Sequence, residues 1–363
     1  VNAFAPALCL QLAVALFTCV TPRSAQAQDK KPPEDALIRC SKCKNEGRIA
    51  CAAHAKDEMH LEDAVNFCST IAECAVCGGT GWLDCKDCEN PKWIASLAKK
   101  AANIAGSTKA RLAKYDQQMG KPLRKVETAH FSLVWELDSL KVDKRQVEHH
   151  ELMHLYAARL ETLFTDYCAA FQCNPRDFAE KQQVFVWWLP ADQDKGSLLF
   201  AGQGGPRGIK LLGSRSVFST CGNKQFFKDD AELHRSIVHN VAHLLLSHQA
   251  PSQWLGNIKG GWVDEGVAHW FEEKYFGVCT NYCYQEQNTA VDFKGGRWKP
   301  IVRKMVAGGE PLPPVGEVLK QNTDTLTLPM HAVAFSYVDY LLALDGKKFN
   351  KLCYLLRGRA ECR

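Results

Sequence analysis

The sequence predicts an α+β fold in two parts, a small cysteine-rich module followed by a large domain with a small sheet and a mainly helical C-terminal part. Three observations predict it. Cysteine pairs with C-x-x-C spacing gather before residue 90, strand-like and helix-like runs alternate from residue 125 onward, and further helical runs follow. The 363 residues are 46% hydrophobic and 23% charged, which is typical of a globular protein. A net charge of +5 is too balanced to imply a nucleic-acid partner.

Residues 1–27 are expected to be a secretory signal. An apolar run at 7–20 is followed by Ala25-Gln26-Ala27, a small-x-small cleavage pattern. The run is too short for a transmembrane helix, and the polar, proline-bearing segment 28–36 is expected to be a linker. We therefore expect an exported protein that is periplasmic, extracellular or associated with the cell envelope. The alternative is a lipid anchor at Cys19, but the residues before it fit a lipobox poorly.

Residues 37–90 contain two matching halves. Each half has a C-x-x-C pair, seven intervening residues and a second pair, which is C-x-x-H in the first half and C-x-x-C in the second. Such pairs bind one face of a tetrahedral zinc ion, and a segment this short buries so little core that metal is expected to supply much of its folding free energy. The expected ligands of two closed, structural zinc sites are Cys40, Cys43, Cys51, His54, Cys74, Cys77, Cys85 and Cys88.

The run CAVCGGTG, from Cys74 to Gly81, resembles the cysteine-rich zinc domain of DnaJ-type co-chaperones. The resemblance implies that the outer pairs share one zinc ion and the inner pairs, which include His54 in place of a cysteine, share the other. The first half also lacks one glycine of the repeat, and no J-domain precedes the module in this sequence, so co-chaperone activity is not implied. A disulfide framework is the alternative in an oxidising compartment. The expected role is structural or partner-binding.

The segment 91–124 is expected to link the module to the large domain. Its stretch 93–118 is rich in Ala, Lys and Leu and predicts a solvated amphipathic helix, with an interruption near Gly106 and Ser107.

The large domain, 125–363, is expected to contain strands and helices in mixed order. The expected strands are 130–137, 184–189 and 215–220, with a glycine-rich loop at 202–213. The expected helices are 147–171, 231–249 (capped by Asp229 or Asp230), 261–275, 335–344 and 348–356.

Two histidine pairs with i, i+4 spacing compete for a catalytic metal site, because this spacing places both imidazoles on one helix face. The run 150–154 (HELMH) matches H-E-x-x-H by its letters, whereas 239–243 (HNVAH) lacks the glutamate. A catalytic zinc site also needs a third protein ligand. Glu265 follows His243 by 22 residues near the start of its own helix, and nothing comparable follows His154. Context therefore favours the second pair.

The runs HNVAHLLL (239–246) and GWVDEGVAHWFEE (261–273) resemble the gluzincin metallopeptidases, specifically exported peptidase-MA-like proteins. The resemblance covers roughly 230 residues. It implies a zincin-like fold in which His239, His243 and Glu265 bind zinc and a polypeptide is the substrate. By analogy with the family, His331 and Tyr337 are further candidates to contact a substrate oxyanion, although no motif fixes them.

Asn240 departs from the family pattern at the position of the general base. A carboxamide does not accept the proton of a zinc-bound water, and loss of a general base typically costs about a hundredfold to ten-thousandfold in rate. The sequence therefore predicts a zinc-binding, metallopeptidase-like protein that is catalytically impaired, a pseudopeptidase. The alternative is a non-enzymatic scaffold whose cleft binds a polypeptide and whose zinc module docks a partner.

Other interpretations of the histidines remain. His150 and His154 are interpreted as helix-surface or core residues with a solvated Glu151, while a third hypothesis places a peptidase there. His239 and His243 are alternatively satisfied core histidines, and Glu151 or another carboxylate is a conceivable substitute base.

The other cysteines of the mature chain are even in number, so disulfides are the default for an exported protein. The short-range candidate pairs are Cys279 with Cys283 and Cys353 with Cys362. The full set is Cys68, Cys168, Cys173, Cys221, Cys279, Cys283, Cys353 and Cys362.

Overall fold

The structure is a computed structural model that describes residues 40–43, 48–52, 67–69, 76, 82–87, 91–283, 293–309 and 311–358. The expected signal segment and linker lie outside these residues, and so do His54, Cys74, Cys77, Cys88 and Cys362. Within the described part of the chain, no helix has the length and apolar character needed to cross a membrane.

The described residues form an α+β fold built on a mixed sheet of six strands in the order β2-β4-β5-β8-β10-β9. Strands β5, β8 and β10 run parallel to one another. At one edge β4 pairs antiparallel with β5 and β2 pairs antiparallel with β4; at the other edge β9 pairs antiparallel with β10. The strands are β2 (Phe67–Cys68), β4 (Lys125–Glu127), β5 (Phe131–Trp135), β8 (Gln182–Trp187), β9 (Gly208–Leu211) and β10 (Val217–Cys221).

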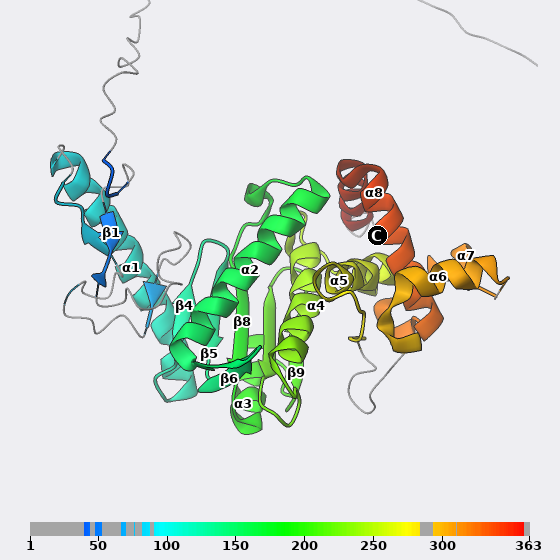
Figure 1. Cartoon of the computed structure of the whole chain (residues 1–363), viewed down its shortest axis with the longest axis horizontal. Helices are drawn as coiled ribbons and strands as arrows, with labels where there is room; N and C mark the ends of the chain where they lie inside the picture. Colours follow the sequence, from blue (N-terminus) through cyan, green and yellow to red (C-terminus); the bar gives the residue numbers. More distant parts are fainter. Residues whose placement is uncertain are drawn as a thin grey trace, which may run out of the picture.

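Helices cover both faces of this sheet, as Figure 1 shows. Side chains alternate along a strand, so Val134 and Phe185 face α1 (Pro91–Met119) and α3 (Pro190–Ala201), whereas Leu133 and Val184 face the opposite layer. That layer consists of α2 (His149–Phe171) and α4 (Asp230–His248). Because both faces of the sheet are covered, every residue of β5 and β10 and all but one of β8 are buried.

A helical lobe follows the sheet. Helix α5 (Gly261–Phe276) packs between α4 and α8 (Leu328–Gly358). Gly266 permits this close approach, because a Cβ there would lie 2.7 Å from the carbonyl oxygen of Ala334. The lobe also contains α6 (Trp298–Ala307) and α7 (Val315–Val318). Short 3-10 helices are Pro175–Asp177, Leu255–Asn257, Lys294–Gly296 and Thr323–Thr325.

Two small sheets complete the described structure. β1 (Arg48–Ala50) pairs antiparallel with β3 (Trp82–Asp84), which joins the two halves of the cysteine-rich module. β6 (Ser139–Val142) and β7 (Arg145–Glu148) form a hairpin directly before α2.

Helix α1 differs from the expected solvated and interrupted linker. It is continuous from Pro91 to Met119, because one Gly-Ser pair costs a helix only about 1 kcal/mol and packing outweighs that cost. Its last turns carry a buried stripe whose Tyr115 packs edge-on against Phe185 and Phe200, with ring centroids 5.3 and 5.0 Å apart. The C-terminal half of this segment is therefore part of the large domain's core.

Other elements of the structure differ from those expected from the sequence. No helix was expected at 190–201. Pro190 is the first residue of α3, where its missing N–H costs no intrahelical hydrogen bond. The β6–β7 hairpin and α6 were not expected. The two late helices appear as a single element, α8, whose backbone leaves the helical region at Asp345 (φ −169°, ψ 97°), between the two predicted segments.

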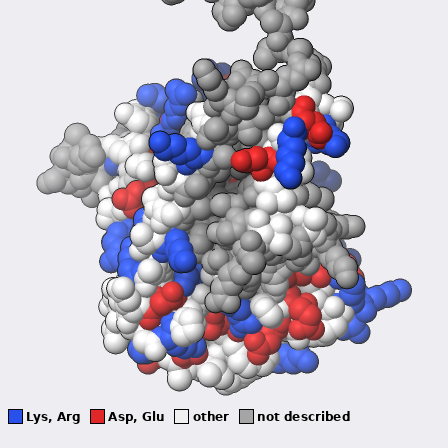
Figure 2. All heavy atoms as spheres, turned by 90° about the vertical axis from the view of Figure 1, so that its left-hand side faces the viewer, with Lys and Arg blue, Asp and Glu red and all other residues white. Residues whose placement is uncertain are grey.

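Figure 2 shows one face of the molecule, on which Lys and Arg side chains are interspersed with Asp and Glu. The described residues drawn there form no extended surface of a single sign.

Candidate metal centre

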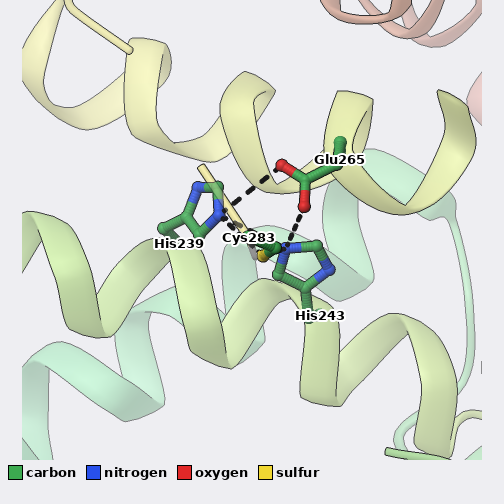
Figure 3. A group of neighbouring side chains, drawn as sticks. All are labelled: His239, His243, Glu265 and Cys283. Atoms are coloured by element: carbon green, nitrogen blue, oxygen red, sulfur yellow. Dashed lines mark hydrogen bonds and ion pairs between the residues drawn. The ribbon is translucent and has the colours of Figure 1, made fainter. Parts of the chain in front are cut away.

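Helices α4 and α5 place two histidines and a glutamate against one another. Asp229 caps α4 by accepting a hydrogen bond from the backbone N–H of Glu232 (2.9 Å), as expected for an N-cap. One helical turn apart on α4, the imidazoles of His239 and His243 point toward α5, which presents Glu265 from its second turn (Figure 3). All three side chains are fully buried. The structure thus brings together the three residues that the sequence singled out in the large domain.

The fourth member of this group is Cys283, whose sulfur faces both imidazoles (Figure 3). Its Sγ lies 3.5 Å from Nε2 of His239 and 3.2 Å from Nε2 of His243. The two Nε2 atoms are 3.3 Å apart, and they lie 3.8 and 3.6 Å from the Glu265 oxygens. Ligands around a tetrahedral zinc ion are about 3.3 Å apart for two nitrogens and about 3.5 Å for nitrogen and sulfur. Four ligand atoms therefore stand at separations that suit one small metal ion.

Buried carboxylates orient both imidazoles. The Nδ1–H of His243 donates to Asp264 Oδ1 (2.8 Å), and the Nδ1–H of His239 donates to Glu272 Oε2 (3.1 Å). This arrangement fixes the tautomer whose Nε2 lone pair points into the cluster, as in carboxylate–histidine–metal triads. Burial lowers the pKa of His239 to about 4, so its imidazole is neutral and able to bind a metal ion.

The two carboxylates are themselves held in place. Asp264 Oδ2 accepts from the indole N–H of Trp254 (2.8 Å) and from the hydroxyl of Thr323 (2.7 Å). Glu272 Oε1 accepts from the backbone N–H groups of Thr280 (2.7 Å) and Asn281 (3.1 Å). Burial opposes its charge, but hydrogen bonds from the neighbouring imidazoles hold the pKa of Glu272 at about 2.

Glu265 is the most unusual carboxylate of the site. Both of its oxygens are buried and, among the described residues, neither accepts a hydrogen bond. Imidazole nitrogens surround them, with His269 Nε2 and His331 Nδ1 each 3.3 Å from Oε2. Asp264 and Glu272 add two more buried negative charges nearby, and they are offset only in part by His269, whose pKa, despite burial, its carboxylate neighbours raise well above the usual value. A divalent cation would balance this charge.

Asn240 does not act as a general base here. Its Nδ2 donates to the carbonyl of Ser236 (2.9 Å), which turns Oδ1 toward the Lys210 ammonium (3.1 Å). Lys210, on β9, also donates to the sulfur of Cys283. Position 240 is therefore linked through a lysine to the fourth member of the cluster.

His331, considered as a substrate contact, instead lies inside this buried network. Its Nδ1 is 3.0 Å from Nε2 of His269. No sequence pattern pointed individually to Asp264, His269, Glu272 or Lys210, and Cys283 was expected only as a disulfide candidate. Asp264 and His269 lie in the run 261–273 around Glu265. Their helical spacing from Glu265 on α5 was the sequence feature that could have indicated them.

In the cysteine-rich module, Cys40, Cys43 and Cys85 form a second group of candidate ligands. The sulfurs of Cys40 and Cys85 are 3.7 Å apart. These three belong to the outer pairs, and the fourth expected ligand, Cys88, lies outside the described residues. Cys51 is described and buried, whereas its expected partners His54, Cys74 and Cys77 are outside that part of the chain.

The described cysteines form no disulfide with one another. The candidate pair Cys279–Cys283 is not bonded, since Cys279 Sγ donates to the carbonyl of His269 (3.4 Å) while Cys283 faces the histidines of α4.

In the run 150–154, the carboxylate of Glu151 forms an ion pair with Arg145 at the surface and does not point toward the neighbouring histidines.

Comparisons of the chain with protein-family models, with curated proteins and with solved structures found no match.

Proposed function

We propose that this chain is an exported zinc-binding protein whose large domain is a zincin-like, metallopeptidase-like domain that has lost catalysis. The observation that carries the proposal is the buried cluster of His239, His243, Glu265 and Cys283, which supplies two imidazoles, a carboxylate and a thiol. This donor set and its spacing suit zinc.

Two features support a non-catalytic role. Catalytic zinc sites have three protein ligands and an open position, whereas structural sites have four. Cys283 supplies the fourth ligand, and Asn240 stands where a peptidase needs a carboxylate. The zinc ion would supply rigidity between α4 and α5 rather than an activated water. This favours a protein that binds a polypeptide or partner protein over one that cleaves it, with the cysteine-rich module as a second zinc-stabilised surface.

The metal site is tested by zinc content. Elemental analysis of the full chain purified without added metal should show one zinc ion fewer in H243Q than in the wild type. H234Q is the matched control, because His234 lies on the same helix but outside the cluster. Equal zinc content in H243Q and the wild type would show that α4 binds no metal.

The loss of catalysis is tested with a broad peptide library. The wild type should cleave nothing, and the double variant N240E/C283A, which restores a carboxylate and opens the fourth position, should cleave. If the wild type cleaves peptides in a zinc-dependent way and H243Q abolishes this cleavage, the proposed loss of catalysis is wrong. Absence of cleavage by the double variant, with zinc still bound, would remove the support for a peptidase-like geometry.

A further inference from the structure

A second mixed cluster of metal-binding side chains lies about the first turns of α2. Cys68, His150 and His154 each offer a ligand atom, and these atoms lie within 4.8 Å of one another. The Sγ of Cys68 is 3.3 Å from Nε2 of His154, and the two imidazole rings are 4.7 Å apart between centroids. A nitrogen and a sulfur bound to one zinc ion are about 3.5 Å apart, so the observed spacing suits a shared metal.

The fold builds this cluster from two distant segments. The i, i+4 spacing places His150 and His154 on one face of α2. Cys68 is fixed across from them because β2 pairs with β4, where it lies opposite Val126. The next residue strengthens this pairing, since the N–H of Ser69 donates to the carbonyl of Lys125 (2.8 Å).

Burial and chemistry both favour a metal ion here. Cys68 and His154 are each 1% exposed, whereas His150 is half-buried, so the cluster reaches toward the surface. Thiolate and imidazole together favour zinc over magnesium or calcium. Glu151 turns away to Arg145, so this is not the arrangement of a peptidase in which the glutamate of H-E-x-x-H serves as the base.

We propose that Cys68, His150 and His154 bind a zinc ion that fastens the cysteine-rich module to the large domain. In the sequence, Cys68 lies between the two halves of the module, while both histidines belong to α2, which packs on the central sheet. The ion would join segments more than 80 residues apart, since 86 positions separate Cys68 from His154. Because these segments meet only in the folded chain, the binding free energy of the ion adds to the free energy of folding. The proposal is independent of the site between α4 and α5.

The test is the zinc retained by the full chain after dialysis against a weak chelator. C68S and H150Q should each retain one zinc ion fewer than the wild type, and C68S/H243Q should retain two fewer. C221S is the matched control, because Cys221 is equally buried in the same sheet but lies outside every metal-capable group of the described residues. It should retain the wild-type content.

The proposal is wrong if C68S and H150Q both keep the wild-type zinc content, or if C221S loses as much zinc as C68S. Should C68S fail to fold, H150Q decides, since His150 is half-buried and its substitution leaves the core intact. Added zinc should also raise the melting temperature of the metal-free wild type more than that of metal-free H150Q. Equal increases would contradict the fastening role.

Discussion

Substitution of Asp264 by asparagine is the sharpest probe of the site between α4 and α5. Three donors face the two oxygens of this side chain: His243 Nδ1–H on one, and Trp254 and Thr323 on the other. An asparagine has one oxygen, which should turn toward Trp254 and Thr323 because two donors face that side. The amide NH₂ would then face His243 Nδ1 and require it to accept.

This exchange reverses the tautomer of His243. When Nδ1 accepts, the proton moves to Nε2, the atom that faces His239 at 3.3 Å and Cys283 at 3.2 Å. A protonated Nε2 has no lone pair for a metal ion, so zinc binding must first restore the other tautomer. Loss of such a partner typically weakens metal affinity about 10–100-fold, or about 1.4–2.7 kcal/mol.

The assay is competition for zinc between the full-length protein and a chromophoric chelator, with D264N compared to the wild type. T323V is the control, because it removes one donor to the distal oxygen of Asp264 and leaves the bond to His243 unchanged. We expect its zinc affinity to stay near that of the wild type. If D264N binds zinc as tightly as the wild type, the carboxylate does not set the tautomer and the reasoning fails.

Three further predictions concern stability. G266A should lower the free energy of urea unfolding by about 1–3 kcal/mol, because the new methyl group would meet Ala334 on α8; an unchanged value would show that the helices can separate. Burial lowers the pKa of His234 from 6.5 to about 3. As pH falls, the unfolded chain therefore takes up a proton at this residue before the folded chain does. His234 should thus lower the free energy of unfolding by up to about 1.4 kcal/mol per pH unit between pH 6.5 and pH 3. H234F should flatten the curve of unfolding free energy against pH in that range, and equal slopes would contradict this. E127Q should lower the free energy of unfolding by about 1.5–3 kcal/mol in chemical denaturation, because Glu127 is buried and the ammonium of Lys181, 3.0 Å away, would lose its counter-charge. An unchanged free energy of unfolding would show that this charge is not needed.

The helix-borne part of the centre was predictable because helical spacing is local. His239 and His243 share a face by periodicity, and Glu265 sits in a motif that begins its own helix. Cys283 was not predictable as a fourth candidate ligand, since it follows the end of α5 and its position depends on how the chain folds back after Gly277.

The same limit applies to the sheet and to the second cluster. The continuous apolar runs of β5 and β8 identified buried strands, whereas the hairpin of β6 and β7 has only one buried residue per strand and gave a weak signal. Cys68 meets α2 only through the pairing of β2 with β4, a contact between distant segments that no local pattern encodes.

Under the proposed function, the missing general base at position 240 and the fourth candidate ligand, Cys283, are physically connected. The ammonium of Lys210 donates to both Asn240 Oδ1 and Cys283 Sγ. Its charge stabilises a thiolate at Cys283, whereas the amide of Asn240 is neutral and does not neutralise it. A carboxylate at position 240 would form an ion pair with Lys210 and compete with the sulfur for the ammonium. It would still face no bound water, because in the proposed zinc site Cys283 takes the fourth position. N240E alone should therefore remain inactive, and only a variant that also removes the sulfur regains both a base and a place for water. Activity in the single variant would show that Cys283 leaves the metal.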